Sequence, residues 1–187
     1  MIVLDSITHV DATAEGQVVV AASHGAIYPA AYAGSYGVAA VVLNDASVGK
    51  DGAGISGLAF LDRYAIPAAT VDYESARIGD GRDTYESGRI SHVNQAARAL
   101  GCIPGLACRE AIEMLARAAA PASRPPKETE ARRRLVAGPP EIWALDSVSL
   151  VQSDDRERIL VTGSHGGLLA GRPETALKHD ALAALYN

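Results

Sequence analysis

The chain has 187 residues, 48% of them hydrophobic and 21% charged, which is the balance of a folded α/β protein with a sizeable core and excludes a disordered chain. The formal net charge of −5 provides no general attraction to phosphate backbones, so we expect no nucleic-acid partner. The N-terminal residues lack a secretory signal, and no stretch approaches the about 20 apolar residues of a membrane span, so we expect no membrane partner and a cytoplasmic location.

An apolar run that ends in Ser-His-Gly occurs twice. The two copies are Val18-Val19-Val20-Ala21-Ala22-Ser23-His24-Gly25-Ala26 and Ile159-Leu160-Val161-Thr162-Gly163-Ser164-His165-Gly166-Gly167, separated by 141 residues. Leu4-Asp5-Ser6-Ile7 matches Leu145-Asp146-Ser147-Val148 at the same spacing. We therefore expect an α/β protein with a mostly parallel sheet flanked by helices, built from two related β-β-α-β halves.

Residues 1–72 alternate between strand and helix patterns. In chain order, the expected elements are a β-hairpin or strand pair over residues 1–22, a helix that carries Tyr28, Tyr32 and Tyr36 and ends at Gly37, a strand over 38–43, a helix over 51–65 and a strand over 66–72. Such alternation predicts parallel strands with right-handed crossovers and a ligand site at the carboxyl ends of the strands.

Residues 73–140 are more varied. The polar, Gly-rich stretch 73–88 is expected to be a long loop, and Ser87 to cap a helix that buries Ile90, Val93, Ala97 and Leu100. A second helix is expected over about 108–120. The Pro-rich stretch 121–140, with Arg132-Arg133-Arg134, reads as a linker with a solvated charged face.

The domain organisation follows from these patterns. We expect a first α/β half with a helical extension over residues 1–120, a Pro/Arg-rich linker over 121–140, and a second, shortened repeat over 141–187 that packs on the first. The end of that repeat, Ala184-Leu185-Tyr186-Asn187, resembles the strand Val41-Val42-Leu43-Asn44.

The Ser-His-Gly corners are the main candidates for a site. Glycine tolerates a positive φ and close approach of a ligand, and the first amides of the following helix favour an anion or a carbonyl oxygen. His24 and His165 titrate near neutral pH, so we expect them to be catalytic. The expected substrate-binding residues beside them are Ser23, Gly25, Ser164, Gly166 and Gly167. Alternatively, a His-Gly pair can simply turn the chain and bind a backbone carbonyl.

Other polar residues fall at or just beyond the expected strand ends. Asp45 and Lys50 are expected to join His24 as catalytic residues, with Asp45 orienting His24 or Lys50, although Asp45 can equally cap a helix. Arg77 is expected to bind a substrate carboxylate, although an arginine among Asp80 and Asp83 can also be an ordinary surface ion pair.

Cys102 and Cys108 are expected to be free thiols. A hydrophobic strand that ends in Ser23-His24-Gly25 resembles the histidine block of caspase-type cysteine proteases, and Ala107-Cys108-Arg109 is similar to their nucleophile segment. The chain departs from that family because no buried strand precedes Cys108 and because the histidine block occurs twice. Two histidines and a carboxylate could form a metal site, but no H-x-x-x-H or H-x-H spacing supports one, and we expect neither metal nor cofactor.

Together these features predict a small-molecule enzyme. We expect a hydrolase or lyase that acts on a small carboxylate, amide or ester between the two Ser-His-Gly loops. The alternative is a non-catalytic domain for small-ligand binding or oligomeric assembly. A homo-oligomer is expected in either case, because the second repeat ends in a strand whose edge a neighbouring subunit could complete.

Overall fold

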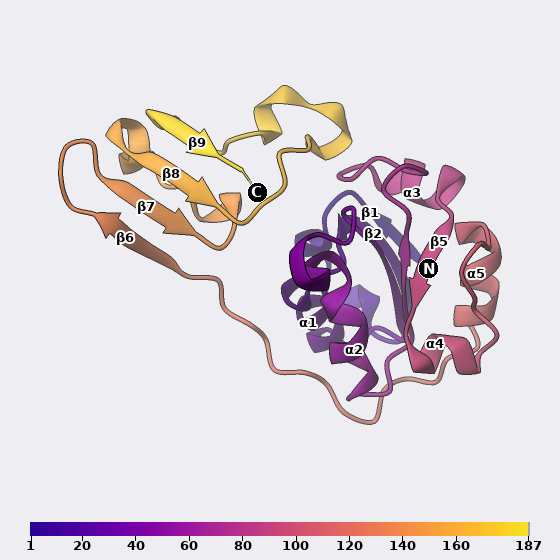
Figure 1. Cartoon of the computed structure of the whole chain (residues 1–187). Coiled ribbons are helices and arrows are strands. Elements are labelled where there is room, and N and C mark those ends of the chain that lie inside the picture. Colours follow the sequence, from indigo (N-terminus) through magenta and orange to yellow (C-terminus); the bar gives the residue numbers. More distant parts are fainter. Residues whose placement is uncertain (187) are drawn as a thin grey trace. The chain divides into compact units, whose positions relative to one another are not determined.

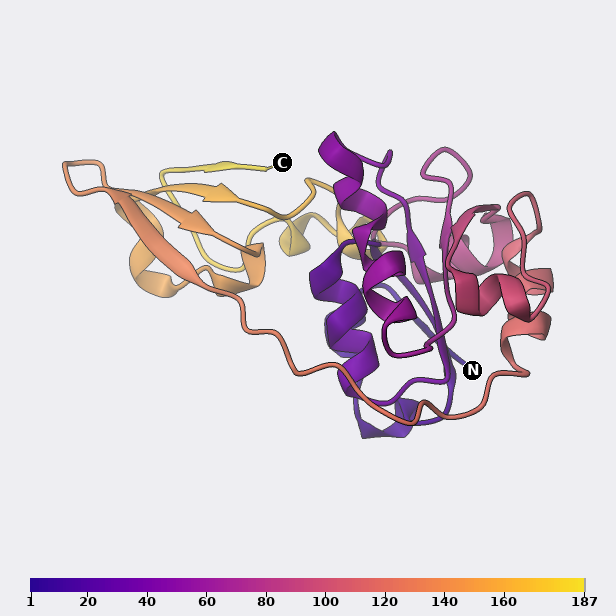
Figure 2. The same cartoon turned by 60° about the horizontal axis from the view of Figure 1, so that its bottom comes forward.

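The computed structural model describes residues 1–186. The chain divides into two compact units, Met1–Glu128 and Thr129–Asn187 (Figures 1 and 2). Asn187, which ends the predicted last strand, lies outside the described residues. The chain is mixed α/β with two sheets of mostly parallel strands, as the sequence predicted, and all the α-helices of residues 1–186 lie in the first unit. Within residues 1–186, no helix combines the length and the apolar character needed to cross a membrane.

The first sheet has five strands in the order of the sequence. They are β1 (Ile2–Leu4), β2 (Val18–His24), β3 (Ala40–Asn44), β4 (Ala68–Val71) and β5 (Ile90–Val93). The first four strands are parallel, and β5 is antiparallel to β4. The predicted hairpin at residues 1–22 is therefore wrong and the predicted strand pair is right. Residues 5–17 form a crossover with two 3-10 helices, η1 (Ile7–His9) and η2 (Ala12–Ala14), which is long enough to join parallel strands.

One face of this sheet is covered by α1 (Ile27–Ser35) and α2 (Ser56–Asp62), which follows the 3-10 helix η3 (Lys50–Ile55), and by Ile7, Val10 and Ala14 of the first crossover (Figure 1). Each crossover between neighbouring parallel strands is right-handed by preference, so successive connections fall on the same side. The core beneath them contains Val19, Val41 and Leu61, all fully buried. The predicted tyrosine-bearing helix is confirmed as α1. The predicted helix over 51–65 begins as a 3-10 segment because Asp51 and Gly52 have non-helical, positive φ values.

The opposite face is covered by α4 (Gln95–Ala99) and α5 (Cys108–Leu115), while α3 (Gly81–Ser87) lies at the end of the sheet near β1 and β2. The core on this face is formed by small and branched side chains: Val18, Val20, Ala40, Val42, Ala69, Val71, Ala76, Ile90, Ala97, Cys102, Cys108, Ala111, Ile112 and Leu115. The apolar spacing in α5 buries four of its eight residues against the sheet.

Two predictions in this region are wrong. The stretch 73–88, predicted as a loop, contains α3, which Asp80 caps by accepting a hydrogen bond from the Asp83 amide. The single helix predicted over residues 90–100 is instead β5 followed by α4. Asn94 separates them, because its buried side chain accepts hydrogen bonds from the amides of Ala68 and Ala97, joining β4 to the first turn of α4.

The second unit contains a four-stranded sheet in sequence order. Its strands are β6 (Arg132–Val136), β7 (Ile142–Leu145), β8 (Ile159–Thr162) and β9 (Ala183–Leu185). Its 3-10 helices are η4 (Val148–Leu150), η5 (Ser153–Glu157), η6 (Leu169–Gly171) and η7 (Pro173–Thr175). The stretch predicted as a linker thus contains β6. Where the β-β-α-β pattern predicts an α-helix between β8 and β9, the chain forms η6 and η7.

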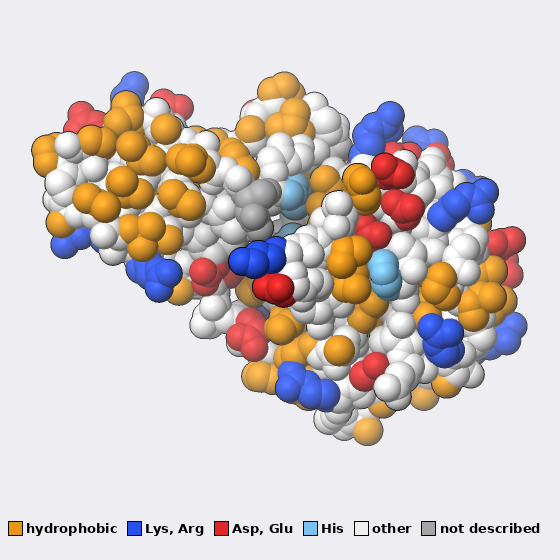
Figure 3. All heavy atoms as spheres, viewed as in Figure 1, with side chains coloured by type: hydrophobic (Ala, Val, Ile, Leu, Met, Phe, Trp, Pro, Cys, Tyr) orange, Lys and Arg blue, Asp and Glu red, His pale blue; other side chains and the backbone are white. Residues whose placement is uncertain are grey.

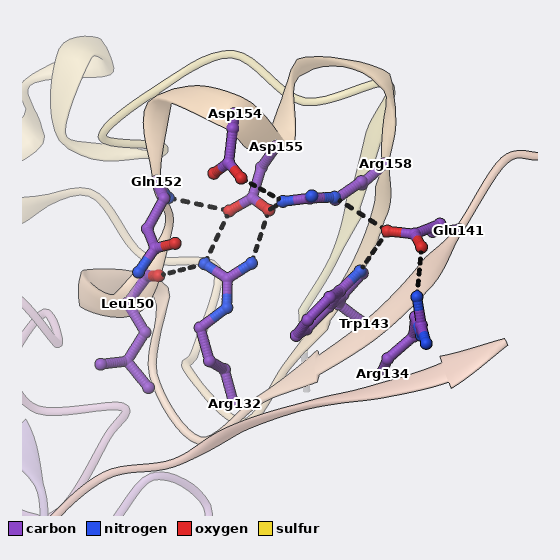
Figure 4. Close-up of polar contacts among 9 residues, drawn as sticks. All are labelled: Arg132, Arg134, Glu141, Trp143, Leu150, Gln152, Asp154, Asp155 and Arg158. Atoms are coloured by element: carbon purple, nitrogen blue, oxygen red, sulfur yellow. Dashed lines mark hydrogen bonds and ion pairs between the residues drawn. The ribbon is translucent and has the colours of Figure 1, made fainter. Parts of the chain in front are cut away.

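In the arginine run of β6, Arg133 and Arg134 are exposed as predicted, but Arg132 is not part of a solvated face. Arg132 is 15% exposed in its side chain and binds the fully buried carboxylate of Asp155 on η5 (Figure 4). Arg158 binds the same carboxylate at 2.9 Å, and both guanidinium groups lie against the Trp143 ring. A buried carboxylate requires such partners, and β6 is therefore tied to the core of the second unit.

Candidate functional site

The carboxyl edge of the first sheet, where β2, β3 and β4 end, brings together several of the predicted site residues. His24 ends β2 and lies opposite Asn44, which ends β3. Asp45 follows β3 directly and donates its amide to the carbonyl of Val71, the last residue of β4. Parallel pairing therefore places His24 and Asp45 on the same edge, as the sequence predicted for its ligand site.

Close packing of glycines forms the corner after His24. The Gly25 amide donates to the Asn44 carbonyl at 2.7 Å, and a Cβ on Gly25 would lie 2.7 Å from both the Gly54 carbonyl and the Thr70 side chain. A Cβ on Gly57 would lie 2.7 Å from the Gly25 carbonyl. These backbones approach too closely for any other residue, and α1 begins two residues after Gly25.

The loop after β3 has a backbone of unusual strain. Ala46, Ser47, Val48 and Gly49 have φ values of 48°, 59°, 64° and 69°, which makes four consecutive left-handed residues, of which only the last is glycine. Left-handed conformation costs roughly 1–2 kcal/mol for each residue with a Cβ, and most of all for a β-branched side chain such as valine. The rest of the edge must therefore hold this loop in place.

Two buried side chains hold it. The Asn44 side chain accepts from the Ala46 amide at 2.9 Å and donates to the Ala76 carbonyl at 3.1 Å. Asp45 Oδ1 accepts from the amides of Ser47 at 3.0 Å and Tyr73 at 3.1 Å. Asp45 thus joins the loops after β3 and β4, and Asn44 stabilises the strained loop to a similar degree. In the sequence, the only indication of a role for Asn44 is its position at the end of an apolar strand.

The remaining predicted residues of this unit differ in their surroundings. Ser23 is 8% exposed, and its Oγ accepts a hydrogen bond from the Ile7 amide at 2.9 Å. Lys50 is exposed at the start of η3, beyond the strained loop. Arg77 has an 80% exposed side chain and pairs with Asp83 at 3.3 Å. A hydrogen bond from the Arg77 amide, more than its charge, lowers the pKa of Asp83.

The second Ser-His-Gly corner belongs to the second unit, after β8. Ser164 Oγ accepts from the Val148 amide at 2.9 Å, and His165 Nδ1 accepts from the Gly167 amide at 3.1 Å. Burial lowers the pKa of His165, which favours its neutral form. A Cβ on Gly166 would lie 3.7 Å from the Tyr186 side chain. This imidazole is thus already engaged with backbone.

The cysteines do not form a nucleophilic site. Both are fully buried beneath the first sheet, and burial raises the pKa of Cys102 to about 11 and that of Cys108 to about 12. A catalytic thiol instead needs a lowered pKa and access to solvent. The similarity of residues 107–109 to a caspase-type nucleophile segment is therefore not matched by their environment.

Among residues 1–186, no group of three or more His, Cys, Asp or Glu side chains is arranged to hold a metal ion. Comparison of the chain with protein-family models, with curated proteins and with solved structures gives no match. The function must therefore be inferred from the geometry of each unit.

Proposed function

We propose that the first unit is a small-molecule enzyme, a hydrolase or lyase acting on a small carboxylate, amide or ester at the carboxyl edge of its sheet. The observation that carries this proposal is the left-handed run Ala46–Gly49 at the edge where His24 ends its strand. Strain of this kind persists where the surrounding structure enforces it, and it concentrates at active sites and ligand clamps. An ordinary connecting loop has no need of it.

Each residue at this edge has a proposed role. His24 transfers a proton as general base or acid, and the first amides of α1, which follow the Gly25 corner, stabilise a developing oxyanion. Asp45 and Asn44 position the strained loop, which delivers Lys50 toward the substrate. Arg77 binds a substrate carboxylate; its surface pair with Asp83 is weak enough to be exchanged for one.

We also propose that the two units share a duplicated origin. The pairing Ile2↔Val19 in the first sheet corresponds to Trp143↔Leu160 in the second, with both partners shifted by the same 141 residues. Ser23 and Ser164 accept equivalent hydrogen bonds of 2.9 Å from Ile7 and Val148. The Ser23 and Ser164 hydroxyls thus have the same structural role, each binding the amide of a matching 3-10 helix. Gly166 and Gly167 form the corner around His165 that corresponds to the Gly25 corner after His24.

The alternative function is non-catalytic binding of a small ligand. It is favoured by the second corner, where the Gly167 amide holds His165 Nδ1 and burial favours the neutral imidazole. A histidine in a lasting bond to backbone positions a loop rather than transferring protons. In this reading the corners bind an anion or a carbonyl oxygen through backbone amides alone.

A screen of simple substrates with a matched pair of variants tests the proposal. The probes are p-nitrophenyl acetate for ester hydrolysis, p-nitroacetanilide for amide hydrolysis, and a set of small 2- and 3-hydroxycarboxylates whose dehydration is followed by ultraviolet absorbance. His24→Gln should lose turnover by about 100-fold or more, as expected for a general acid or base. The control His92→Gln, on β5, should retain turnover, and both variants should unfold like the parent chain.

Two results would contradict the enzymatic proposal. One is equal turnover in His24→Gln and the parent chain. The other is the absence of turnover with every probe, combined with small carboxylates that shift the NMR signals of the Gly25 amide but leave the titration of His24 unchanged. The second result would support the binding alternative.

A further inference from the structure

The second sheet has one covered face and one open face. Side chains on the covered face, including Leu145 and Leu160, pack against η4 and the segment before β9. The open face is apolar and lies over all four strands (Figure 3). Its members include Val136, Val161 and Leu185, with exposed fractions of 46%, 39% and 51%. Exposed apolar surface that spans a whole sheet indicates a contact surface.

The first sheet contains the same arrangement of positions. Ile159 pairs with Ala183 and Val161 with Leu185 in the second sheet, just as Val18 pairs with Ala40 and Val20 with Val42 in the first. The open face of β7, β8 and β9 thus corresponds to the face of β1, β2 and β3 that contains Val20 and Val42, whereas β6 has no counterpart in the first sheet. The first unit therefore indicates what kind of element such a face accommodates.

In the first unit this face is covered by helix. Val20 and Val42 are fully buried, and their cluster includes Cys108, Ala111 and Leu115 of α5. The buried residues of α5 recur every three or four positions, so that one stripe of small and branched side chains meets the sheet. No helix takes this place over β6–β9 within residues 129–186.

Charge gives a second indication of the partner. Arg133 lies opposite Ala144 in the pairing of β6 with β7, which places it on the open face, and it is exposed. On α5, the acidic residues Glu110 and Glu113 are exposed beside the buried stripe. A helix of this type laid across the open face would offer carboxylates to Arg133 at its rim.

We propose that the open face of the second sheet is a docking surface for an α-helix of a separate polypeptide, one with a stripe of small and branched apolar residues flanked by acidic ones. The covering of the corresponding face by α5 within this chain defines that chemistry. The surface is independent of the proposed activity, which belongs to the first unit.

The test uses the full chain and a synthetic peptide with the sequence of residues 105–120 of this protein, in which the cysteine is replaced by alanine. In a methyl-labelled sample, the peptide should shift the signals of Ile142, Ile159, Val161 and Leu185 and leave those of Val20 and Val42 unchanged. A peptide in which the positions of Ala111 and Leu115 carry glutamate should cause no shifts.

Variants of the chain locate the binding. Val161→Glu should weaken binding of the peptide at least 10-fold, whereas Ser153→Glu, which adds the same charge on exposed η5, should not. If Val161→Glu unfolds the second unit, the isosteric Val161→Thr should still weaken binding. Shifts confined to the first unit, or no binding at millimolar peptide, would overturn the proposal. A concentration-dependent dimer of the chain alone that shifts the same methyl groups would assign the face to a second copy and also overturn it.

Discussion

Arg132 and Asp155 form a two-pronged ion pair inside the second unit, with Nη1 to Oδ2 at 3.1 Å and Nη2 to Oδ1 at 2.7 Å (Figure 4). Oδ1 of Asp155 also accepts from Arg158 at 2.9 Å, and Oδ2 accepts from the Gln152 amide at 2.8 Å. This one carboxylate therefore joins β6, η5 and the start of β8. Removing it would leave two arginines without their shared partner.

Replacing the carboxylate should selectively destabilise the second unit. For Asp155→Asn we expect a loss of about 3 kcal/mol in its free energy of unfolding, the scale measured when one partner of a buried ion pair is removed. Trp143 is the chain's single tryptophan and lies against both arginines, so its fluorescence during denaturant unfolding reports this unit. Asp154→Asn is the control, because Asp154 is 63% exposed. Similar losses in both variants would contradict the assignment.

The same carboxylate should make the second unit sensitive to acid. Burial alone would raise the pKa of Asp155, but hydrogen bonds from Arg132, the Gln152 amide and Arg158 outweigh it and lower the pKa below the ordinary 3.8. Asp155 therefore stabilises the fold fully above about pH 3.8, and this contribution is lost as the pH falls through the lower, folded-state pKa. Unfolding followed by Trp143 fluorescence from about pH 6 to about pH 2 should show a steeper loss in the parent chain than in Asp155→Asn. Parallel curves would contradict this.

The sequence predicted the parts of the fold that depend on local pattern. Continuous apolar runs identified β2 and β3, and spacing identified α1 and α5. It failed where one side chain acts over a long distance. Asn94 ends β5 and begins α4 through bonds to β4, so a pattern read as one helix is divided by a tertiary contact. Likewise, β6 is charged and exposed along most of its length, and pairing with β7 makes it a strand.

The candidate site was predictable in position but less so in function. The rule that ligands bind at the carboxyl ends of parallel strands placed His24 and Asp45 on one edge. The roles of Ser23 and Asp45 depend on which distant amide each one meets, Ile7 and Tyr73 respectively, and no local pattern encodes that. The left-handed run after Asp45 could not be predicted from the sequence either, because alanine, serine and valine rarely adopt a positive φ.

Because the loop after β3 is strained, two alanine-to-glycine substitutions should change the free energy of unfolding of the first unit in opposite directions. Ala46→Gly should raise the free energy of unfolding of the first unit by up to about 1 kcal/mol, because glycine has no penalty at a φ of 48°. Ala59→Gly, at an exposed position within α2, should lower it by about 1 kcal/mol. Hydrogen exchange of the β3 amides, followed by mass spectrometry, measures both changes. A loss of similar size in both variants would show that residue 46 is not strained.

The buried cysteines should react only when the first unit opens. With the pKa of Cys102 near 11 and that of Cys108 near 12, almost no thiolate forms at pH 8, and neither sulfur is exposed to solvent. Hydrogen exchange of the β3 amides gives the equilibrium constant for opening of the first unit. We expect iodoacetamide to alkylate the native chain more slowly than the denatured chain by a factor close to this constant. The denatured chain is the control, in which both thiols should react. Rapid labelling of Cys108 in the native chain would contradict its place in the core and reopen the case for a thiol nucleophile.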